Sequence, residues 1–390
     1  MNYKMIVFSL ICLWSVNVNA QKGRSYPAEW QKFTAAESGY EVIKLTSDTS
    51  DDCRLYFYNN PMVKDMNSIV FASKRTGYWN LFLISLQDGI ITQLTEGKKI
   101  QARSAVVSSS KEEVYFVSGK EIKSCNLRNY QEKVLYALPD SFQVSASLGI
   151  NTDGSMLALA ITKKVDVVVS KLKHFDNAGE KYILHPESRV IVIATDGSMS
   201  KTVRTENNWL SHVVFNPSES NILLYCQEGP WQMVEQRMWI CNINDTSVHY
   251  PLRKEEIPGV KIGHEYWFPD GKHVGYQVSS SSIKKGIGIA DYRTGKYIEY
   301  DGADDSHTET DFTGNYFVGD GKNSNRILSL YHIENNKLVK KVLVKHNGSF
   351  DQEYSHPHPS FIDEKGSILY TSNTDGNCNI YLIKAGSLVE

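Results

Sequence analysis

Short runs of apolar or alternating residues recur from about residue 30 onward, and turn residues separate them. Helical periodicity is hard to find in the same region, so the pattern predicts an all-β protein built from short strands. One series occurs seven times: SIVFAS at 68–73, EVYFVS at 113–118, MLALAIT at 156–162, NILLYCQ at 221–227, HVGYQVS at 273–279, NYFVGDG at 315–321 and SILYTSN at 367–373. The starts of these runs are 45, 43, 65, 52, 42 and 52 residues apart.

A second apolar run follows each member of this series. These runs are WNLFLIS at 79–85, EIKSCN at 121–126, RVIVIAT at 189–195, RMWICNI at 237–243, GIGIADY at 286–292, RILSLYH at 326–332 and NIYLIKA at 379–385. Seven units with a period of roughly 40–50 residues are typical of a β-propeller with four strands per blade. A β-sandwich, the alternative, would not sustain seven copies of one unit. The third unit holds the longest insertion, at about 164–188, where we expect a surface loop or hairpin over one face.

The two ends of the chain predict how the ring of blades closes. The last unit stops soon after its third strand, NIYLIKA, and so is one strand short. Near the N-terminus, VIKLTSD at 42–48 resembles ITQLTEG at 91–97, the fourth strand of the first unit. We therefore expect residues 41–48 to complete the last blade and remove an open sheet edge. This gives one seven-bladed β-propeller domain over residues 21–390, closed by an N-terminal strand.

The first 20 residues have a different character. Lys4 precedes the apolar run MIVFSLICLW at 5–14, and the small-residue motif Val18-Asn19-Ala20 follows. This order is typical of a secretory signal peptide, here cleaved after Ala20, so we expect a periplasmic or secreted protein. A membrane anchor is the alternative, but ten apolar residues fall short of the roughly 20 that span a bilayer. No membrane insertion is expected once the signal is removed.

Composition excludes several classes of protein. The 42 Lys and Arg residues nearly balance the 44 Asp and Glu residues, so no basic surface indicates a nucleic-acid partner. Five cysteines follow the signal without CxxC spacing, which excludes zinc clusters and favours small buried side chains over a disulfide framework. The sequence also lacks a G-x-S-x-G elbow, a P-loop and a dinucleotide fingerprint.

Histidines recur where the innermost strand of a blade is expected. That strand should lie about ten residues before each member of the first series and line the central channel. The residues at these positions are Arg103 in the second blade, His212 in the fourth, His264 in the fifth, His307 in the sixth, and His356 with His358 in the seventh. Residues i and i+2 of an extended chain face the same side. His356 and His358 should therefore point together toward partners that other blades supply.

Three neutral imidazoles and one oxygen ligand would form a site for Mn, Fe, Ni or Zn. His264, His356 and His358 are the strongest trio, and Gln352 or Glu353 is placed to supply the oxygen. The alternative is a set of polar channel residues bonded to water or backbone. The paired histidines, with a third at matched register, favour the metal site.

Three segments carry a resemblance to a known family. HVVFNPSESNILLYCQEGPWQMVEQRMW at 212–239, GHEYWFPDGK at 263–272 and HPHPSF at 356–361 resemble the oligogalacturonate lyases, polysaccharide lyase family 22. The resemblance extends from about residue 37 to the C-terminus. It implies a TolB-like seven-bladed propeller that binds a divalent metal, typically Mn²⁺, in its channel. It also implies cleavage of short oligogalacturonides, or of a related acidic oligosaccharide, by β-elimination.

The resemblance implies roles for individual residues as well. It places the metal on His264, His356 and His358, with Glu353 where the family has a glutamine and Gln352 one residue earlier. It makes His212 the base and Arg189 the catalytic arginine. Substrate contacts are expected from four residues in or beside the channel motifs, namely Arg103, Gln227, Trp231 and His307. Gln227 and Arg54 stand where the family pattern has histidines, which is compatible with a different uronide or with lost activity.

The implied reaction explains these residue types. Removing the proton alpha to a uronate carboxylate creates a dianion, which a divalent metal on the carboxylate stabilises. A histidine base contributes roughly 10²–10⁴-fold, and an arginine grips a carboxylate in bidentate fashion. Two other functions stay open. One is a non-catalytic TolB-like propeller acting as a binding or scaffold module, and the other is a metal-dependent enzyme acting on a different acidic sugar.

Overall fold

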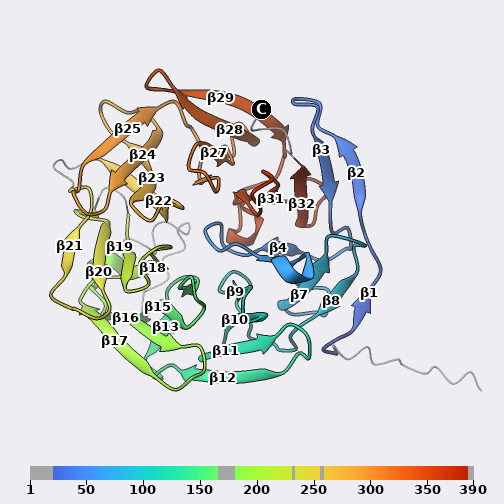
Figure 1. The fold of residues 1–390 in the computed structure, drawn as a ribbon, viewed down its shortest axis with the longest axis horizontal. Coiled ribbons are helices and arrows are strands. Elements are labelled where there is room, and N and C mark those ends of the chain that lie inside the picture. Colours follow the sequence, from blue (N-terminus) through green and yellow to red (C-terminus); the bar gives the residue numbers. More distant parts are fainter. Residues whose placement is uncertain (1–20, 166–180, 231–232, 255–258, 385–390) are drawn as a thin grey trace, which may run out of the picture.

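Seven antiparallel sheets form a ring around a central channel (Figure 1). This computed structural model describes residues 21–165, 181–230, 233–254 and 259–384. The sheets confirm the predicted seven-bladed propeller, while residues 1–20, the predicted signal peptide, lie outside the described part. No helix in the described ranges has the length and apolar character that crossing a membrane requires.

The blades follow one another along the chain, and in each the first strand lies nearest the axis (Figure 1). Blade 1 has β4 (Asp52–Arg54), β5 (Met62–Val63), β6 (Ser68–Ser73), β7 (Asn80–Ser85), β8 (Ile91–Gln93) and, at its outer edge, β1 (Ser25–Tyr26). Blade 2 has β9 (Val106–Ser108), β10 (Glu113–Ser118), β11 (Glu121–Asn126) and β12 (Glu132–Ala137). Blade 3 has β13 (Phe142–Val144), β14 (Gly149–Ile150), β15 (Met156–Lys163), β16 (Ser188–Ala194) and β17 (Ser200–Glu206).

The remaining four blades repeat the pattern. Blade 4 has β18 (Leu210–Phe215), β19 (Ile222–Gln227), β20 (Met238–Asn242) and β21 (His249–Pro251). Blade 5 has β22 (Lys261–Trp267), β23 (His273–Ser279), β24 (Gly286–Asp291) and β25 (Tyr297–Asp301). Blade 6 has β26 (Thr308–Thr310), β27 (Tyr316–Gly319), β28 (Ile327–Glu334) and β29 (Lys337–Lys345). Blade 7 has β30 (Ser360–Phe361), β31 (Ile368–Ser372), β32 (Asn379–Lys384), β3 (Glu41–Lys44) and β2 (Gln31–Thr34).

The N-terminal segment closes the ring. Strand β3 pairs antiparallel with β32, so that Glu41 lies opposite Lys384 (Figure 1). This confirms the predicted closure, although the strand covers 41–44 and not all of 41–48. Strand β2 pairs outside β3, and β1 pairs with β8 of blade 1. A hairpin therefore completes blade 7, and the segment before it fastens blade 7 to blade 1.

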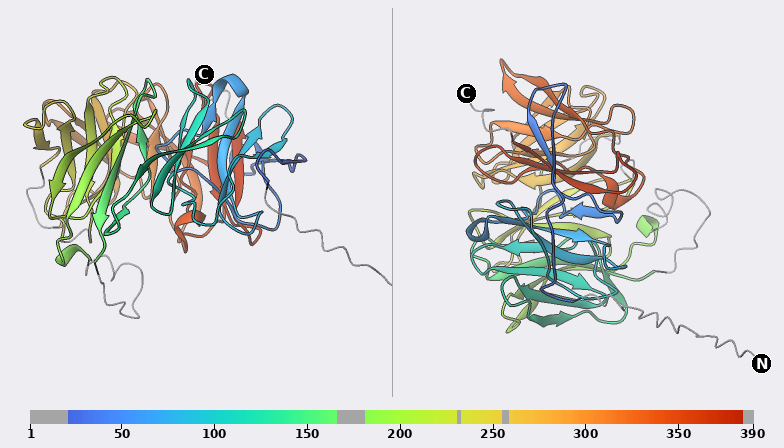
Figure 2. Two further views of the ribbon diagram at one scale, coloured as in Figure 1. Left: turned by 90° about the horizontal axis from the view of Figure 1, so that it is seen from below. Right: turned by 90° about the vertical axis from the view of Figure 1, so that its right-hand side faces the viewer.

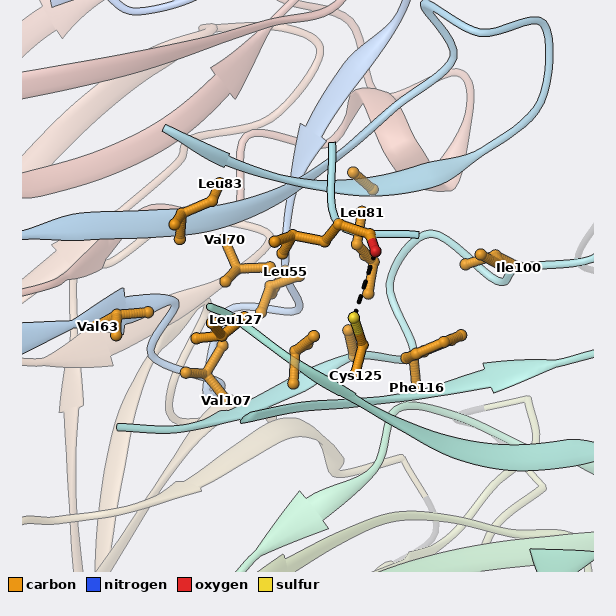
Figure 3. Packing of buried hydrophobic residues seen from close by; sticks show 14 of the residues in the cluster. Leu55, Val63, Val70, Leu81, Leu83, Ile100, Val107, Phe116, Cys125 and Leu127 are labelled. Atoms are coloured by element: carbon orange, nitrogen blue, oxygen red, sulfur yellow. Dashed lines mark hydrogen bonds between the residues drawn. The ribbon is translucent and has the colours of Figure 1, made fainter. Parts of the chain in front are cut away.

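Apolar side chains between neighbouring blades hold the ring together. Between blades 1 and 2, Val70 and Leu81 pack with Val107 and Phe116 in one buried cluster (Figure 3). Burying one such side chain stabilises the fold by roughly 1.5–3 kcal/mol. Cys125 belongs to this cluster, and its thiol donates to the main-chain oxygen of Leu94 at 3.3 Å. The five cysteines of the described part are all buried and unpaired, as predicted.

Short elements mark the two faces of the ring (Figure 2). The 3-10 helix η2 (Glu353–Ser355), just before the paired histidines, lies on one face. The described end of the third-blade insertion, from residue 181 onward, projects from the same face, while residues 166–180 lie outside the described part. The other short helix, η1 (Lys64–Met66), lies on the opposite face.

Candidate metal centre and active site

The five predicted channel histidines lie at the start of innermost strands. His212 is on β18 and His264 is on β22, while His307 immediately precedes β26. His356 and His358 lie just before β30. The structure therefore brings residues from blades 4 to 7 to one mouth of the channel, as the repeat pattern predicted.

Two of these histidines sit in equivalent β-bulges. In blade 4 the pairing steps from Ser211–Cys226 to Val214–Leu224, which leaves one extra residue on the inner strand at His212. Blade 5 has the same irregularity at His264. Both residues have left-handed backbones, with φ of 50° and 53°, and His358 has φ of 45°. Such bulges redirect a side chain, and strained backbones of this kind cluster at functional sites.

The tautomer of His264 is fixed by Gln277. His264 Nδ1 lies 2.8 Å from Gln277 Oε1, and Gln277 Nε2 donates to the main-chain oxygen of Asp305 at 2.8 Å. Because the second bond identifies the oxygen end of the amide, Nδ1 of His264 carries the hydrogen and Nε2 carries the lone pair. Burial, and then the neighbouring His307, lowers the pKa of His264 to about 3. The ring is therefore neutral at pH 7, as a metal ligand must be.

His307 and His356 are fixed in the same way. His307 Nδ1 donates to Asp320 Oδ2 at 2.6 Å, and burial holds the pKa of His307 well below its usual value. His356 Nε2 donates to the main-chain oxygen of Phe350 at 3.1 Å. These bonds leave lone pairs on Nε2 of His307 and Nδ1 of His356. The Nδ1 atom of His356 is buried and has no hydrogen-bond partner among the described residues. An outer hydrogen bond of this kind accompanies almost every metal-bound histidine.

The ring nitrogens converge closely enough to share one ion. His307 Nε2 and His358 Nε2 are 2.9 Å apart, and one ligand atom from each of His307, His356 and His358 lies within 4.8 Å of the others. Two ligands about 2.1 Å from a metal and at right angles to each other are about 3 Å apart. The His264 ring adjoins this trio, 4.3 Å from the His307 ring between centroids. His307, which we expected to contact substrate, thus lies inside the predicted metal group.

Glu353, and not Gln352, faces these histidines. Its Oε2 lies 3.6 Å from His356 Nδ1, and its Oε1 lies 3.9 Å from His358 Nε2. Gln352 precedes η2, and its side chain is exposed. Partial burial would raise the pKa of Glu353, but Arg103 and the nearby imidazoles outweigh it and lower that pKa. An anionic oxygen is therefore available to complete a site of imidazole nitrogens, a donor set that suits Mn²⁺ and related ions.

Two buried arginines secure the histidine loop. Arg103 donates to the main-chain oxygens of Tyr354 and His356 at 3.2 and 2.9 Å. Its Nη1 lies 3.3 Å from His358 Nε2. Arg54 donates to the main-chain oxygen of His358 and is fully buried. The substrate contact expected of Arg103 stays a prediction, while its guanidinium holds the loop. Arg54, which stands where the family pattern has a histidine, holds the same loop.

An aromatic segment crosses the axis beneath the histidines. The chain after β4 reaches the middle of the ring (Figure 1), and it carries Tyr56, Phe57 and Tyr58. The Phe57 ring lies 5.8 Å from that of His307 and 5.7 Å from that of His358. This segment packs under the imidazoles and forms the floor of the site.

His212 lies at the edge of this floor, beside a second set of polar groups. Its Nδ1 lies 3.3 Å from the Tyr58 hydroxyl, and its Nε2 lies 3.5 Å from Glu228 Oε2. The Tyr56 ring is 5.2 Å from the His212 ring and 4.9 Å from that of His358, so it separates the two histidines. His212 is thus next to the metal group without joining it, and with Cys226 and Glu228 it forms a second set of possible ligand atoms that lie within 4.8 Å of one another.

Two predicted residues make their contacts away from the cluster. Arg189 is on β16, where it donates to Glu187 Oε1 at 2.6 and 2.8 Å and covers the Phe142 ring. Gln227 ends β19, and its amide donates to Glu206 Oε2 at 3.0 Å. Trp231 lies outside the described residues. The roles given to Arg189, Gln227 and Trp231 therefore stay predictions from the resemblance.

A cavity of about 610 Å³ occupies the opposite mouth of the channel. Its lining includes Tyr58, Lys64, Trp267 and Phe312, and Lys64 belongs to η1 on the opposite face (Figure 2). None of the five channel histidines lines it. The aromatic segment therefore separates this cavity from the metal group.

Sequence reasoning missed the residues that orient the histidines. Glu228 lies inside the quoted motif CQEGPW, and its acidic side chain next to a predicted base was an available signal. Asp320 follows β27 directly, and Gln277 lies within β23, so their contacts depend on strand register. Tyr58 comes from a segment whose path across the axis no periodicity reveals.

Comparison with known proteins gives a consistent result over nearly the whole chain. The family model described as "Oligogalacturonate lyase" matches residues 20–389. The chain is 28% identical over 384 residues to the oligogalacturonide lyase of Pectobacterium atrosepticum, covering 93% of this chain and 98% of that protein. It is also 28% identical over 386 residues to the oligogalacturonate lyase of Dickeya dadantii, with the same coverage.

Solved structures of the same kind superpose well. A structure of an oligogalacturonate lyase in complex with manganese gives a TM-score of 0.86 at 26% identity, covering 94% of this chain and 98% of the other. The oligogalacturonate lyase of Vibrio parahaemolyticus gives a TM-score of 0.87 at 25% identity, covering 95% and 100%.

Proposed function

This chain belongs to the oligogalacturonate lyase family, and we propose that it cleaves short oligogalacturonides by metal-assisted β-elimination at the axial histidine group. It is a carbon–oxygen lyase that uses a divalent cation, Mn²⁺. The observation that carries the proposed site is the approach of His307 Nε2 to His358 Nε2 at 2.9 Å, with the outer nitrogens of His264, His307 and His356 each bonded to a fixed acceptor. A scaffold module has no need of such an arrangement.

The proposed metal ligands are His264, His307, His356 and His358, with Glu353 as the oxygen donor. The bound cation supplies a Lewis acid that stabilises negative charge on the substrate carboxylate. Asp320, Gln277 and the Phe350 carbonyl hold the imidazoles in the required tautomers. The aromatic floor keeps the ligand group from opening into the cavity at the opposite mouth.

His212 is the proposed base. Nδ1–H donates to the Tyr58 oxygen, which leaves the lone pair on Nε2 to accept the proton from C5 of the uronate. The electrons of the broken C5–H bond form the C4–C5 double bond, and the C4–O4 bond breaks. The departing oxygen takes a proton from water in the open channel. The products are a shortened oligosaccharide and a 4,5-unsaturated uronide.

A direct assay tests this function. Protein stripped with EDTA and reloaded with Mn²⁺ should produce a rise in ultraviolet absorbance when galacturonate dimers or trimers are added. The same protein without added metal should show little activity, and His264→Ala should not recover with Mn²⁺. No rise across a panel of uronides, with metal bound, would favour the scaffold interpretation.

We also propose that the chain is exported after removal of residues 1–20. The charged start, the apolar run and the Val18-Asn19-Ala20 motif support this. The family match beginning at residue 20 supports it as well, because it leaves that segment outside the catalytic domain. Mass spectrometry of the protein from the periplasm or medium should find Gln21 at the N-terminus. Retention of the intact first 20 residues would contradict export by this route.

A further inference from the structure

The two ring nitrogens of His212 have chemically different neighbours. On one side, the Tyr58 hydroxyl lies 3.3 Å from His212 Nδ1 and 2.7 Å from Ser147 Oγ. Burial holds the pKa of Tyr58 well above its usual value, so the phenol keeps its hydrogen. Tyr58 can then donate to Ser147 and accept Nδ1–H from His212. In this arrangement the lone pair of His212 is on Nε2.

On the other side lies a carboxylate held in a rigid network. Glu228 Oε2 is 3.5 Å from His212 Nε2, and it accepts the Ser211 hydroxyl at 2.7 Å. Arg237 donates to Glu228 Oε1 and to Glu265 Oε2, both at 3.0 Å. Burial alone would raise the pKa of Glu228, but Arg237, His212 and Ser211 outweigh it and hold that pKa far below its usual value. Glu228 is therefore ionised beside the nitrogen that takes the proton.

The remaining charged or titratable groups around His212 do not duplicate this role. Glu265 is bonded to Arg237, and the ring of Tyr56, with its pKa raised by burial, lies tilted against that of His212. Lys181 lies near Glu228, over the Trp209 ring. His264 and His307 have lowered pKa values, so at pH 7 both rings are neutral and place no charge near His212. Glu228 is the one carboxylate within ion-pair distance of His212 in the described part of the chain.

We propose that Tyr58 and Glu228 are the positioning residues of the base His212. Tyr58 fixes the neutral tautomer that presents Nε2 to the substrate, and Glu228 stabilises the imidazolium formed when Nε2 takes the C5 proton. The inference rests on the proposed function, in which His212 is the base. Neither residue belongs to the His307, His356 and His358 group, and the role proposed for each is in proton transfer at His212.

The experiment compares pH profiles of kcat/KM for Mn²⁺-loaded variants. Glu228→Gln should lower kcat about tenfold and move the acidic limb about one pH unit lower, because an opposite charge within a few ångströms no longer favours the protonated ring. Glu228→Asp keeps the charge and should keep the limb near its wild-type position. Tyr58→Phe should lower kcat about tenfold without moving the limb, because no charge is removed.

Glu299→Gln is the matched control. Glu299 lies on the outer strand β25, and this change breaks its ion pair with Arg253. It should leave rate and profile unchanged, and all variants should bind Mn²⁺ like the wild type. A Glu228→Gln profile that coincides with the wild-type profile, or a limb displaced equally in Glu228→Asp, would overturn the role of Glu228. Undiminished kcat in Tyr58→Phe would overturn that of Tyr58. Inactive wild-type protein would instead refute the proposed function.

Discussion

His307 Nε2 lies 2.9 Å from His358 Nε2, although 51 residues separate the two histidines and they belong to neighbouring blades. The hydrogen bond to Asp320 places the His307 hydrogen on Nδ1, so its Nε2 is an acceptor. His358 Nε2 also lies 3.3 Å from Arg103 Nη1, and Nδ1 of the same ring has no hydrogen-bond partner among the described residues. The two Nε2 atoms thus face each other at a separation that suits two ligands of one ion.

His307→Ala should abolish stable Mn²⁺ binding. The variant removes a ligand whose nitrogen adjoins that of His358, and it leaves Asp320 buried without the ring it orients. Loss of an outer partner alone typically costs 10–100-fold in metal affinity, so loss of the ligand should cost at least about 100-fold. Metal content after dialysis measures this directly. His332→Ala, a partly exposed histidine on β28, is the control and should retain metal. Full Mn²⁺ occupancy in His307→Ala would exclude it from the site.

Glu353→Gln should weaken metal binding and raise turnover. A neutral amide removes one negative charge from the ligand set, so the ion is held less tightly but withdraws more charge from the substrate carboxylate. We expect an affinity loss of about tenfold and a kcat increase of a few fold at saturating Mn²⁺. Glu364→Gln, an exposed carboxylate near η1, should change neither quantity. Unchanged affinity and rate in Glu353→Gln would show that Glu353 is not a ligand.

The fold was predictable because its determinants are local. Apolar runs such as 68–73, 113–118 and 273–279 coincide with β6, β10 and β23, since a strand between two packed blades must be apolar on both faces. The closing strand was predictable from its likeness to 91–97. The additional outer strand β2 was not, because residues 31–34 are all exposed and carry no burial signal.

The sequence predicted which residues lie in the candidate site better than it predicted where their side chains point. The spacing between each inner strand and the next strand located the histidines. Where the rings point depends on the bulges at His212 and His264 and on the left-handed backbone of His358. Those features depend on pairing with β19 and β23, which no pattern in the inner strands reveals. The substrate roles expected of Arg103 and His307 stay predictions, while in the structure Arg103 also secures the histidine loop and His307 adjoins His358.

His264 should make metal-free protein less stable as the pH falls below about 6.5, against the opposing effect of buried carboxyls such as Asp320, whose pKa burial raises to about 6. Burial, and then His307, lowers the pKa of His264 to about 3 in the folded protein, while the unfolded chain titrates near 6.5. Between these values the unfolded state binds more protons, so stability decreases with falling pH by roughly 1.4 kcal/mol per unit for this site. His307 acts in the same direction. Urea denaturation of EDTA-treated protein at several pH values measures the slope, which His264→Gln should reduce. An equal slope in the wild type and in His264→Gln would contradict the buried neutral state of His264.

Lys181→Met should raise KM for galacturonate trimers about tenfold while changing kcat little. The Lys181 ammonium lies 3.8 Å from the Trp209 ring centroid, near Glu228, and forms no hydrogen bond or ion pair with any residue that the structure describes. A half-buried ammonium near Glu228, with no hydrogen bond or ion pair to the described residues, is suited to bind a uronate carboxylate.

The pH dependence of KM gives an independent check on Lys181. Burial lowers the pKa of Lys181 to about 8, against the opposing effect of Glu228. The lysine therefore loses its charge as the pH rises through about 8, and the wild-type KM should rise over the same range. In Lys181→Met the KM should already be high and should stay flat there. Lys296→Met, an exposed lysine on a blade-5 turn, should behave like the wild type. A KM that rises near pH 8 equally in the wild type and in Lys181→Met would assign the effect to another group and remove Lys181 from substrate binding.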